Sequence, residues 1–118
     1  MTSAAARANA ILQETLLGEV FDNLDAAVFV ADEQGRYVAV NARACAITGY
    51  SREELLGKTV HEIAVDTADY TPAISGRKNA GTVALRRKDG THVEVEWRVA
   101  TTTIAGMPFY VGLNWNVD

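Results

Sequence analysis

The sequence predicts an α+β domain in which a sheet of five strands carries short helices on one face. Two observations lead to this fold class. The stretch Ala27–Gly57 reads as two strands followed at once by two short helices, and the last third of the chain alternates apolar and polar residues as β-strands do. With 118 residues, the chain has the size of one domain.

An amphipathic helix is expected before the sheet. Its apolar residues recur at helical spacing: Leu12, Leu16, Leu17, Val20, Phe21 and Leu24. Leaving such a stripe in water would forgo about 1.5–3 kcal/mol per side chain. The stripe therefore packs on the domain's own sheet or on a partner helix, with an ordinary core helix as the alternative. We expect residues 1–23 to form a flanking helix and residues 24–118 the main domain, with Leu12, Leu16, Leu17, Val20 and Phe21 as candidate dimer contacts.

The first two strands are expected at Val28–Ala31 and Tyr37–Val40, with Asp32–Arg36 as the turn between them. Gly35 suits a positive φ within this turn. A short helix should then follow over Ala42–Thr48.

Capping signals set the limits of the two short helices. Asn41 can cap the first helix at its N-terminus, and Gly49 can end it. Ser51 and Glu54 have the spacing of a capping box, which predicts a second helix ended by Gly57.

The pattern is weaker between Lys58 and Ala80. Val60–Ala64 suggests one helical turn, and Ala68–Ser75 suggests another that Pro72 interrupts. We expect a loop over Gly76–Gly81.

The final third should form three strands. Thr82–Arg87 alternates, and the Asp-Gly pair in Lys88-Asp89-Gly90 favours a type I′ hairpin turn. The next strand has one apolar face, made by Val93, Val95, Trp97 and Val99. After a loop around Gly106, the last strand has an apolar face made by Phe109, Val111, Leu113, Trp115 and Val117. The expected sheet is largely antiparallel, with one face under the helices.

Several strings along this pattern resemble the PAS family of sensor domains. They are FVAD at residues 29–32, GRYVAVN at residues 35–41, TGYSREELLGK at residues 48–58 and RRKDG at residues 86–90. The resemblance covers about residues 24–117, and residues 4–21 look like the N-terminal flanking helix of many members. It departs from the family at His61–Asp66, where many members have a His-Pro-Asp-Asp-like stretch, and at Asn116–Asp118, where an Asp-Ile-Thr is usual.

The resemblance implies a five-stranded antiparallel sheet with strand order 2-1-5-4-3 and small helices on one face. It also implies a sensory or regulatory module, often dimeric, that relays a signal through flanking helices. The output domain would be a kinase, a cyclase or a transcription factor outside these residues. A ligand-free dimerisation scaffold is the alternative within the family.

Composition excludes several classes of function. A net charge of −4 gives no electrostatic basis for binding nucleic acid or anionic lipid. The longest apolar run, Ala26–Ala31, is too short to span a bilayer. Cys45 is the one cysteine, so no internal disulfide can form, and a reducing cytoplasmic compartment is expected.

Few residues suggest a cofactor or a metal. Cys45 lies among alanines on a short helix, where core packing is expected, and the light-sensing flavin branch of the family needs an Asn-Cys-Arg string that does not occur after Gly57. His61 and His92 are expected at the surface, which disfavours haem. Trp97 and Trp115 should fill the core, with stacking on a non-covalent flavin as the alternative. The cofactor, flavin and haem included, is left open.

A small-ligand pocket is expected between the helices after Lys58 and the sheet. Its candidate residues are Asp69, Tyr70, Val83, Leu85, Val95, Trp97 and Leu113. No Gly-x-Gly pair occurs, which removes the dinucleotide and P-loop fingerprints. The basic run Arg86–Lys88 is interpreted as a solvated hairpin. A small α+β isomerase or dehydratase is the rival class, but the inward strand positions carry no acid–base pair.

Overall fold

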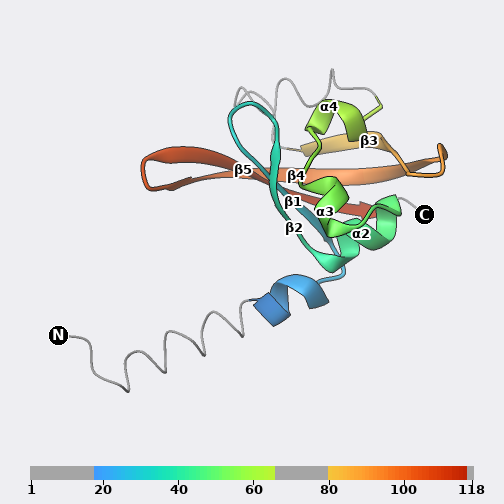
Figure 1. Cartoon of the computed structure of the whole chain (residues 1–118), viewed down its shortest axis with the longest axis horizontal. Helices are drawn as coiled ribbons and strands as arrows, with labels where there is room; N and C mark the ends of the chain where they lie inside the picture. The colour runs from blue at the N-terminus through green and yellow to red at the C-terminus, as the bar shows by residue number, and fades with distance from the viewer. Residues whose placement is uncertain (1–17, 66–79, 117–118) are drawn as a thin grey trace.

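Five strands of the described chain form one antiparallel sheet with helices on one face. The computed structural model describes residues 18–65 and 80–116. The strands are β1 (Ala27–Ala31), β2 (Tyr37–Val40), β3 (Ala80–Arg86), β4 (His92–Ile104) and β5 (Met107–Asn116). They lie in the order β2-β1-β5-β4-β3, which confirms the predicted order (Figure 1).

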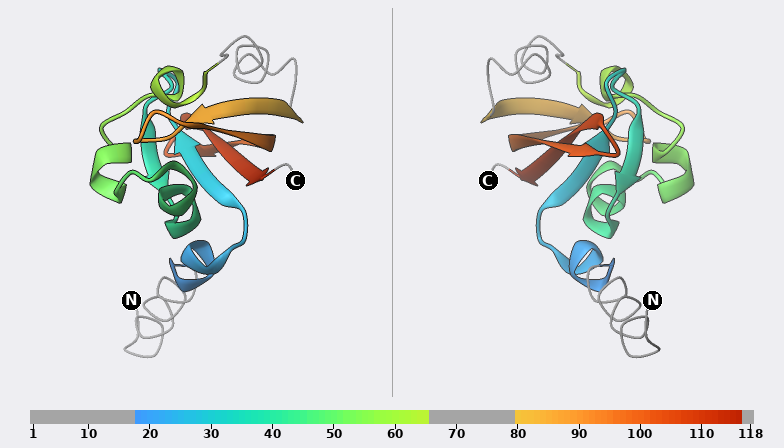
Figure 2. Two further views of the ribbon diagram at one scale, coloured as in Figure 1. Left: turned by 90° about the vertical axis from the view of Figure 1, so that its right-hand side faces the viewer. Right: turned by 90° about the vertical axis from the view of Figure 1, so that its left-hand side faces the viewer.

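Three short helices cover one face of this sheet, which we call the inner face (Figure 2). They are α2 (Ala42–Thr48), α3 (Arg52–Leu55) and α4 (Val60–Ile63), and a further helix over residues 18–23 precedes β1. The expected helix over Ala68–Ser75 lies outside the described residues.

The predicted caps are present. The Asn41 side chain accepts from the N–H of Ala44, and Gly49 ends α2 with a φ of 79°. Ser51 and Glu54 form the reciprocal capping box of α3. These polar groups satisfy helix-end N–H groups that would otherwise lack partners.

Backbone hydrogen bonds attach the segment around α4 to the β1–β2 turn and to β3. The N–H of Val60 donates to the carbonyl of Gly35 at 2.8 Å, and the N–H of Val65 donates to that of Ala84 at 2.8 Å. Val60 and Ile63 are therefore held over the sheet, and both are buried.

The core lies between the inner face and the helices. Its fully buried side chains include Leu55 and Ile63 from the helices and Leu85, Val95 and Trp97 from the strands. The predicted inward face of β4 is thus confirmed for Val95 and Trp97, while Val93 and Val99 pack against the core half-buried.

The predicted inward face of β5 is wrong. Asn114 pairs with Ala27 and Trp97, whereas Leu113 pairs with Val28 and Arg98. Cross-strand partners share a face, so Asn114 points to the helices and Leu113 points away. β5 is apolar at its odd-numbered positions, but its register with β1 places the even-numbered ones inward.

Two further details differ from expectation. The expected loop over Gly76–Gly81 is wrong at its end, because Ala80 and Gly81 already belong to β3. The type I′ turn expected at Asp89-Gly90 is also wrong, since only Gly90 has a positive φ. A type I′ pair occurs instead between β4 and β5, where Ala105 and Gly106 have φ values of 52° and 80°.

Candidate functional site

A cavity lies on the inner face, between β1, β2 and the central strand β5. Its volume is about 40 Å³. Eleven residues line it: Phe29, Ala31, Asp32, Gly35, Tyr37, Val60, Leu85, Val99, Tyr110, Gly112 and Asn114. Gly112, at the centre of β5, is one of these lining residues and contributes no side chain to the cavity.

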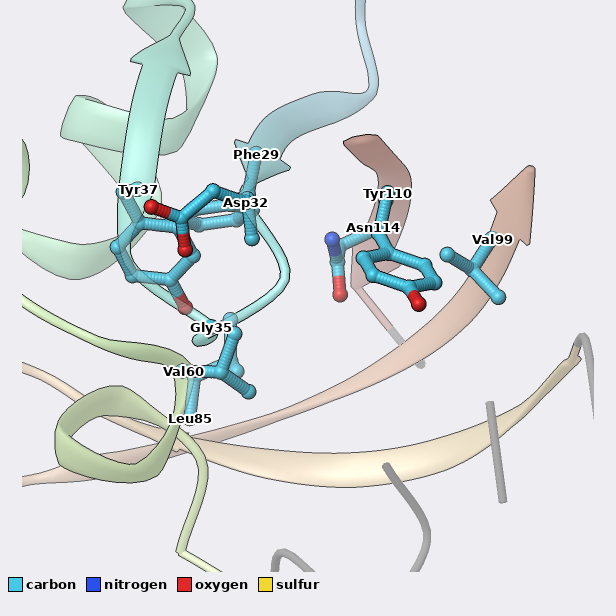
Figure 3. A pocket seen from close by; sticks show the side chains of 11 residues that line it. Phe29, Asp32, Gly35, Tyr37, Val60, Leu85, Val99, Tyr110 and Asn114 are labelled. Carbon is cyan, nitrogen blue, oxygen red and sulfur yellow. The ribbon is translucent and has the colours of Figure 1, made fainter. Parts of the chain in front are cut away.

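Aromatic side chains form two walls of the cavity (Figure 3). Phe29 and Tyr37 stand on one side, with ring centroids 5.2 Å apart. Tyr110 and Asn114 of β5 stand on the other side. Val60 of α4 and Leu85 of β3 line the cavity between these two sides. The site therefore offers aromatic faces and few polar atoms, which is the usual lining of a small-molecule pocket.

Asp32 is the one charged residue among those that line the cavity, and its carboxylate is engaged in the β1–β2 turn. Its Oδ1 accepts from the N–H groups of Gln34 and Arg36, and its Oδ2 accepts from the Arg36 guanidinium at 3.1 Å. Partial burial raises the pKa of Asp32, but these hydrogen bonds outweigh it and the net pKa is lowered. The carboxylate is thus ionised and already neutralised within its own turn.

The structure distributes the predicted pocket residues over three places. Leu85 lines the cavity. Val83, Val95 and Trp97 are buried in the core beside it and do not line it. Leu113 lies on the opposite face of the sheet, and Asp69 and Tyr70 lie outside the described residues.

A second polar constellation joins the helix over residues 18–23 to the core. Asn41 is fully buried, and its side chain makes four hydrogen bonds. Oδ1 accepts from the N–H groups of Val28 and Ala44, while Nδ2 donates to the carbonyls of Phe21 at 2.8 Å and Ala26 at 3.0 Å. This uses the full donor and acceptor capacity of the amide.

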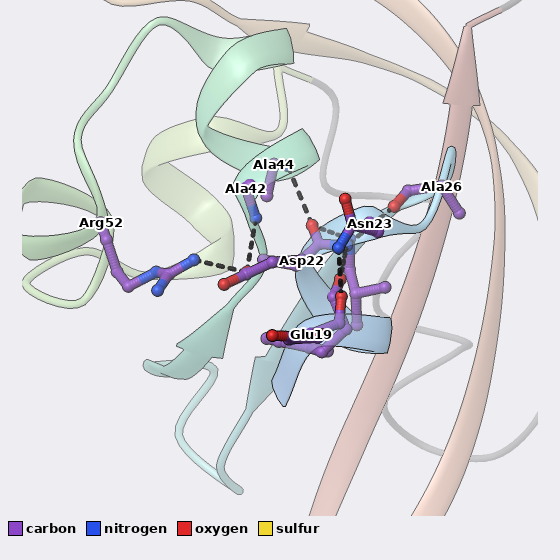
Figure 4. A network of polar contacts seen from close by, with 10 residues as sticks. Glu19, Asp22, Asn23, Ala26, Ala42, Ala44 and Arg52 are labelled. Atoms are coloured by element: carbon purple, nitrogen blue, oxygen red, sulfur yellow. Dashed lines mark hydrogen bonds and ion pairs between the residues drawn. The ribbon is translucent and has the colours of Figure 1, made fainter. Parts of the chain in front are cut away.

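Asp22 adds a charged contact to the same junction (Figure 4). Its Oδ1 accepts from the N–H of Ala42 at 3.0 Å and from the Arg52 guanidinium at 2.6 Å. The end of the N-terminal helix is therefore tied to the start of α2 and to α3. We call Asn41, Asp22 and Arg52 the junction.

The remaining candidate side chains are placed as follows. Cys45 packs half-buried against the core, and burial raises the pKa of its thiol despite the nearby Arg52. A raised pKa disfavours the reactive thiolate. His61 and His92 are exposed, as predicted. Trp115 is 37% exposed on the outer face, so the prediction that it fills the core is wrong.

Neither a metal cluster nor a helix able to cross a membrane occurs in the described ranges. Within residues 18–65 and 80–116, no three His, Cys, Asp or Glu side chains gather as a metal site. None of the helices that the structure describes has the length and apolar character needed to cross a bilayer.

The cavity is small in comparison with the cofactors that the sequence left open. A water molecule needs about 10–15 Å³ on this measure, so the enclosed space holds about three. Pockets for drug-sized ligands are typically about 300–1,000 Å³. Within the residues that the structure describes, the volume of the cavity is therefore well below that of a drug-sized ligand pocket.

Comparison with known proteins identifies the family. The model of the PAS fold matches residues 15–112, so the chain belongs to the PAS family, a family of sensory signalling modules. No curated protein matches the sequence.

Solved structures of PAS domains share this fold closely. A PAS domain from a two-component sensor histidine kinase superposes with a TM-score of 0.83 at 22% identity, covering 92% of this chain and 99% of that one. The PAS domain of an HTR-like protein from Haloarcula marismortui gives 0.79 at 26% identity, covering 94% and 98%. The PAS domain of nitrogen regulation protein NR(II) from Vibrio parahaemolyticus gives 0.72 at 17% identity, covering 86% and 98%.

Sequence reasoning missed most of the residues that line the cavity. A usable signal was present on β5, where Tyr110, Gly112 and Asn114 alternate along one face. A glycine between an aromatic and an amide residue, two positions apart on each side, marks a strand face with room beside it. The apolar odd-numbered positions of β5 instead predicted that the other face points inward.

Proposed function

We propose that this PAS domain is a sensory module that binds a small uncharged molecule on the inner face of its sheet. Ligand binding changes the packing at the junction, and this change is transmitted to the N-terminal helix and to an output domain outside these residues. The module acts as a dimer in the cytoplasm. The observation that carries the proposal is the cavity around Gly112, which lies between the sheet and the helix α4 that covers it.

The lining favours an uncharged ligand. Asp32 is the one charged side chain in it, and Arg36 and the turn N–H groups already compensate that charge. An ion entering this apolar space would lose its hydration without gaining a counter-charge. The Tyr110 hydroxyl and the Asn114 amide supply polar atoms that could orient a small neutral molecule.

The junction supports a relay toward the N-terminus. Asn41 bonds the carbonyl of Phe21 in the helix and the N–H of Val28 in β1, so a shift of β1 and a shift of the helix are coupled through one side chain. Phe29, one residue after Val28, lines the cavity. Couplings between two sites are typically about 1–3 kcal/mol, which modest differential contacts provide.

A ligand-free scaffold is the second candidate, and the filled part of the inner face favours it. Gly81 lies so close to the Trp97 ring that an added Cβ would meet it at 3.0 Å. Toward β3 the core is therefore complete without a ligand. In this alternative the domain only joins two copies or two proteins. An enzymatic role is not part of the proposal, which invokes binding without turnover.

The test compares two substitutions on β5. Gly112→Val places a side chain in the cavity, whereas Val111→Ile adds one methylene on the opposite face and serves as the control. We expect native mass spectrometry of the purified protein to show a bound small molecule that Gly112→Val loses and Val111→Ile keeps. An absorbance spectrum without visible bands is expected. Bare mass in all three proteins would favour the scaffold.

The relay has its own measurement. Hydrogen exchange at residues 18–24 should slow on ligand binding, because binding holds β1 and, through Asn41, the helix end. Asp22→Asn keeps an acceptor for Ala42 but loses the charge that faces Arg52, so the ligand should protect the helix less in this variant. Equal protection in both proteins would remove the junction from the relay.

A further inference from the structure

The β4–β5 hairpin extends beyond the other described strands as an arm. β3 pairs with β4 only as far as Arg98, and β1 pairs with β5 only as far as Tyr110. β4 and β5 remain paired up to their turn, so the hairpin projects past β1 and β2 (Figure 1). We call residues 101–109 the arm. A two-stranded ribbon is marginally stable in water, so the arm gains stability from a further strand.

The backbone of the arm alternates in the side to which its N–H and C=O groups point. The hairpin has a two-residue type I′ turn, so the flanking residues Ile104 and Met107 bond each other. Every second residue of β4, counted back from Ile104, therefore bonds β5. Thr101 and Thr103 lie between these residues and direct their N–H and C=O groups to the opposite edge. Pro108 agrees with this alternation, because its position on β5 faces away from β4 and requires no N–H there.

The remaining edges of the described sheet are protected against pairing with another strand. At the β2 edge, the N–H of Tyr37 donates to the carbonyl of Lys58 at 3.1 Å. At the β3 edge, the carbonyl of Ala84 accepts from the N–H of Val65 at 2.8 Å. The β5 edge of the arm contains Pro108, and a proline cannot donate to a ladder of hydrogen bonds.

The β4 edge of the arm has no such protection in the part of the chain that the structure describes. No described strand pairs with this side of β4 beyond Arg98. Residues 99–104 read VATTTI, without a charge, a proline or a glycine. Proteins usually place charges, prolines or bulges on free edges to prevent pairing. This edge is therefore suited to receive another strand.

A second copy of the same edge complements it. If two arms lie antiparallel about a two-fold axis at Thr102, Thr101 of each copy lies opposite Thr103 of the other. The N–H and C=O groups that both residues direct outward then all find partners across the axis. Thr102 lies opposite its counterpart, and cross-strand threonine pairs stabilise a sheet. No two like charges meet within the arms.

The end of β3 selects this register. Ala80 pairs with Arg98 and so occupies the place beside it. A two-fold axis at Thr101 would bring Ile104 of one copy into that place on the other. An axis at Thr102 places Ile104 opposite Ala100 instead, one pair short of Ala80 for each residue of shift.

We propose that the arm pairs edge to edge with the arm of a second copy of this chain, with the two-fold axis at Thr102. The contact joins two sheets into one and uses neither face of the sheet nor the N-terminal helix stripe. It rests on the proposed function only in that a dimer is part of it, and it requires no bound ligand.

The first test changes the charge of the arm at two exposed positions. Thr101→Lys with Thr103→Lys places like charges opposite each other twice, whereas Thr101→Lys with Thr103→Glu places opposite charges there and is the control. In sedimentation velocity of the whole chain, we expect the wild type and the control to dimerise. The dissociation constant of the Lys/Lys variant should be at least about tenfold higher than that of the control.

The second test measures the register with single cysteines in a Cys45→Ser background. Residues opposite each other in a non-hydrogen-bonded pair have Cα atoms about 4.5 Å apart, within the reach of a disulfide. Thr102→Cys should therefore form an intermolecular disulfide under oxidising conditions. Thr101→Cys is the control, because its two copies are offset by about 7 Å along the strands and cannot be bridged. We expect cross-linking at least about tenfold faster for Thr102→Cys.

Several outcomes would overturn the proposal. These are a wild-type monomer at about 100 μM, equal dissociation constants for the two charge variants, and equal cross-linking of the two cysteine variants. A dimer that Leu16→Asp with Val20→Asp dissociates but the Lys/Lys variant leaves intact would also overturn it, while supporting the helix stripe. Loss of ligand binding alone would contradict only the sensory role.

Discussion

The two faces of the sheet differ along β5: the more apolar face points outward, and the face with Tyr110, Gly112 and Asn114 points toward the helices. The inner face lies under α2, α3 and α4 and buries Trp97 to 1% exposure, whereas the outer face leaves Trp115 at 37%. The two tryptophans lie on neighbouring strands and differ mainly in face. Apolar character therefore does not identify the core of a central strand, and the register with its neighbours does.

The largest expected effect compares these two tryptophans directly. Trp97→Ala should lower the free energy of unfolding by about 3–5 kcal/mol, because it removes a fully buried ring and leaves a cavity. Trp115→Ala should cost less than about 1 kcal/mol in the monomer. Urea denaturation followed by circular dichroism at low protein concentration measures both. Similar costs would mean that the outer face is packed as tightly as the inner one.

A second comparison sets the buried Asn41 against the exposed Asn23. Asn41→Leu should cost about 2–4 kcal/mol, since four backbone groups lose their partner in a buried place. Asn23→Leu should cost less than about 0.5 kcal/mol, because the Asn23 side chain donates one exposed hydrogen bond to Glu19. Chemical denaturation of both variants measures the two losses in free energy of unfolding. A small cost at Asn41 would show that water replaces the amide and that the junction is open.

Two glycines sharpen the contrast within the inner face. Gly81→Ala would bring a Cβ to 3.0 Å from the buried Trp97 ring and should cost about 1–3 kcal/mol. Gly112→Ala would place its Cβ 3.5 Å from the Phe29 carbonyl and 3.7 Å from Asn114 Nδ2, which are ordinary contacts. It should be neutral or stabilise by up to about 1 kcal/mol, because alanine restricts the unfolded chain. Thermal melts of the two variants test whether the inner face has more free space at Gly112 than at Gly81.

The smallest effect concerns an exposed contact that helps to hold the helices over the inner face. The N–H of Ser51 and then the ammonium of Lys88 lower the pKa of Glu54 to about 2. Because the folded pKa is below the unfolded value of about 4.3, the stabilisation is complete above that value and declines as pH falls toward 2. Denaturant midpoints measured from pH 6 to 2 should therefore fall less steeply for Glu54→Gln.

Lys88→Met provides the companion variant for this pH series. It removes the second cause of the lowered pKa and keeps the Ser51 contact, so its slope should lie between those of the wild type and Glu54→Gln. Identical slopes in the three proteins would show that the Glu54 contacts do not contribute to holding α3 against the β3–β4 hairpin.

The sequence alone determined the local elements of this protein. Strand alternation, the cap at Asn41, the capping box at Ser51 and Glu54, and the glycine at position 35 each act through neighbouring residues, and the structure has all of them. The family resemblance supplied the strand order. Local signals succeed because their energies depend on residues within a turn or two.

Tertiary structure decided which face of β5 points inward and hence where the cavity lies. That choice depends on pairing Ala27 with Asn114, residues far apart in the sequence, and a one-residue shift would exchange every side chain between faces. The cavity around Gly112 and the exposed side chain of Trp115 are two consequences of this one register. The hydrophobic pattern of β5 alone favours the other face, so the pairing with β1 overrides it.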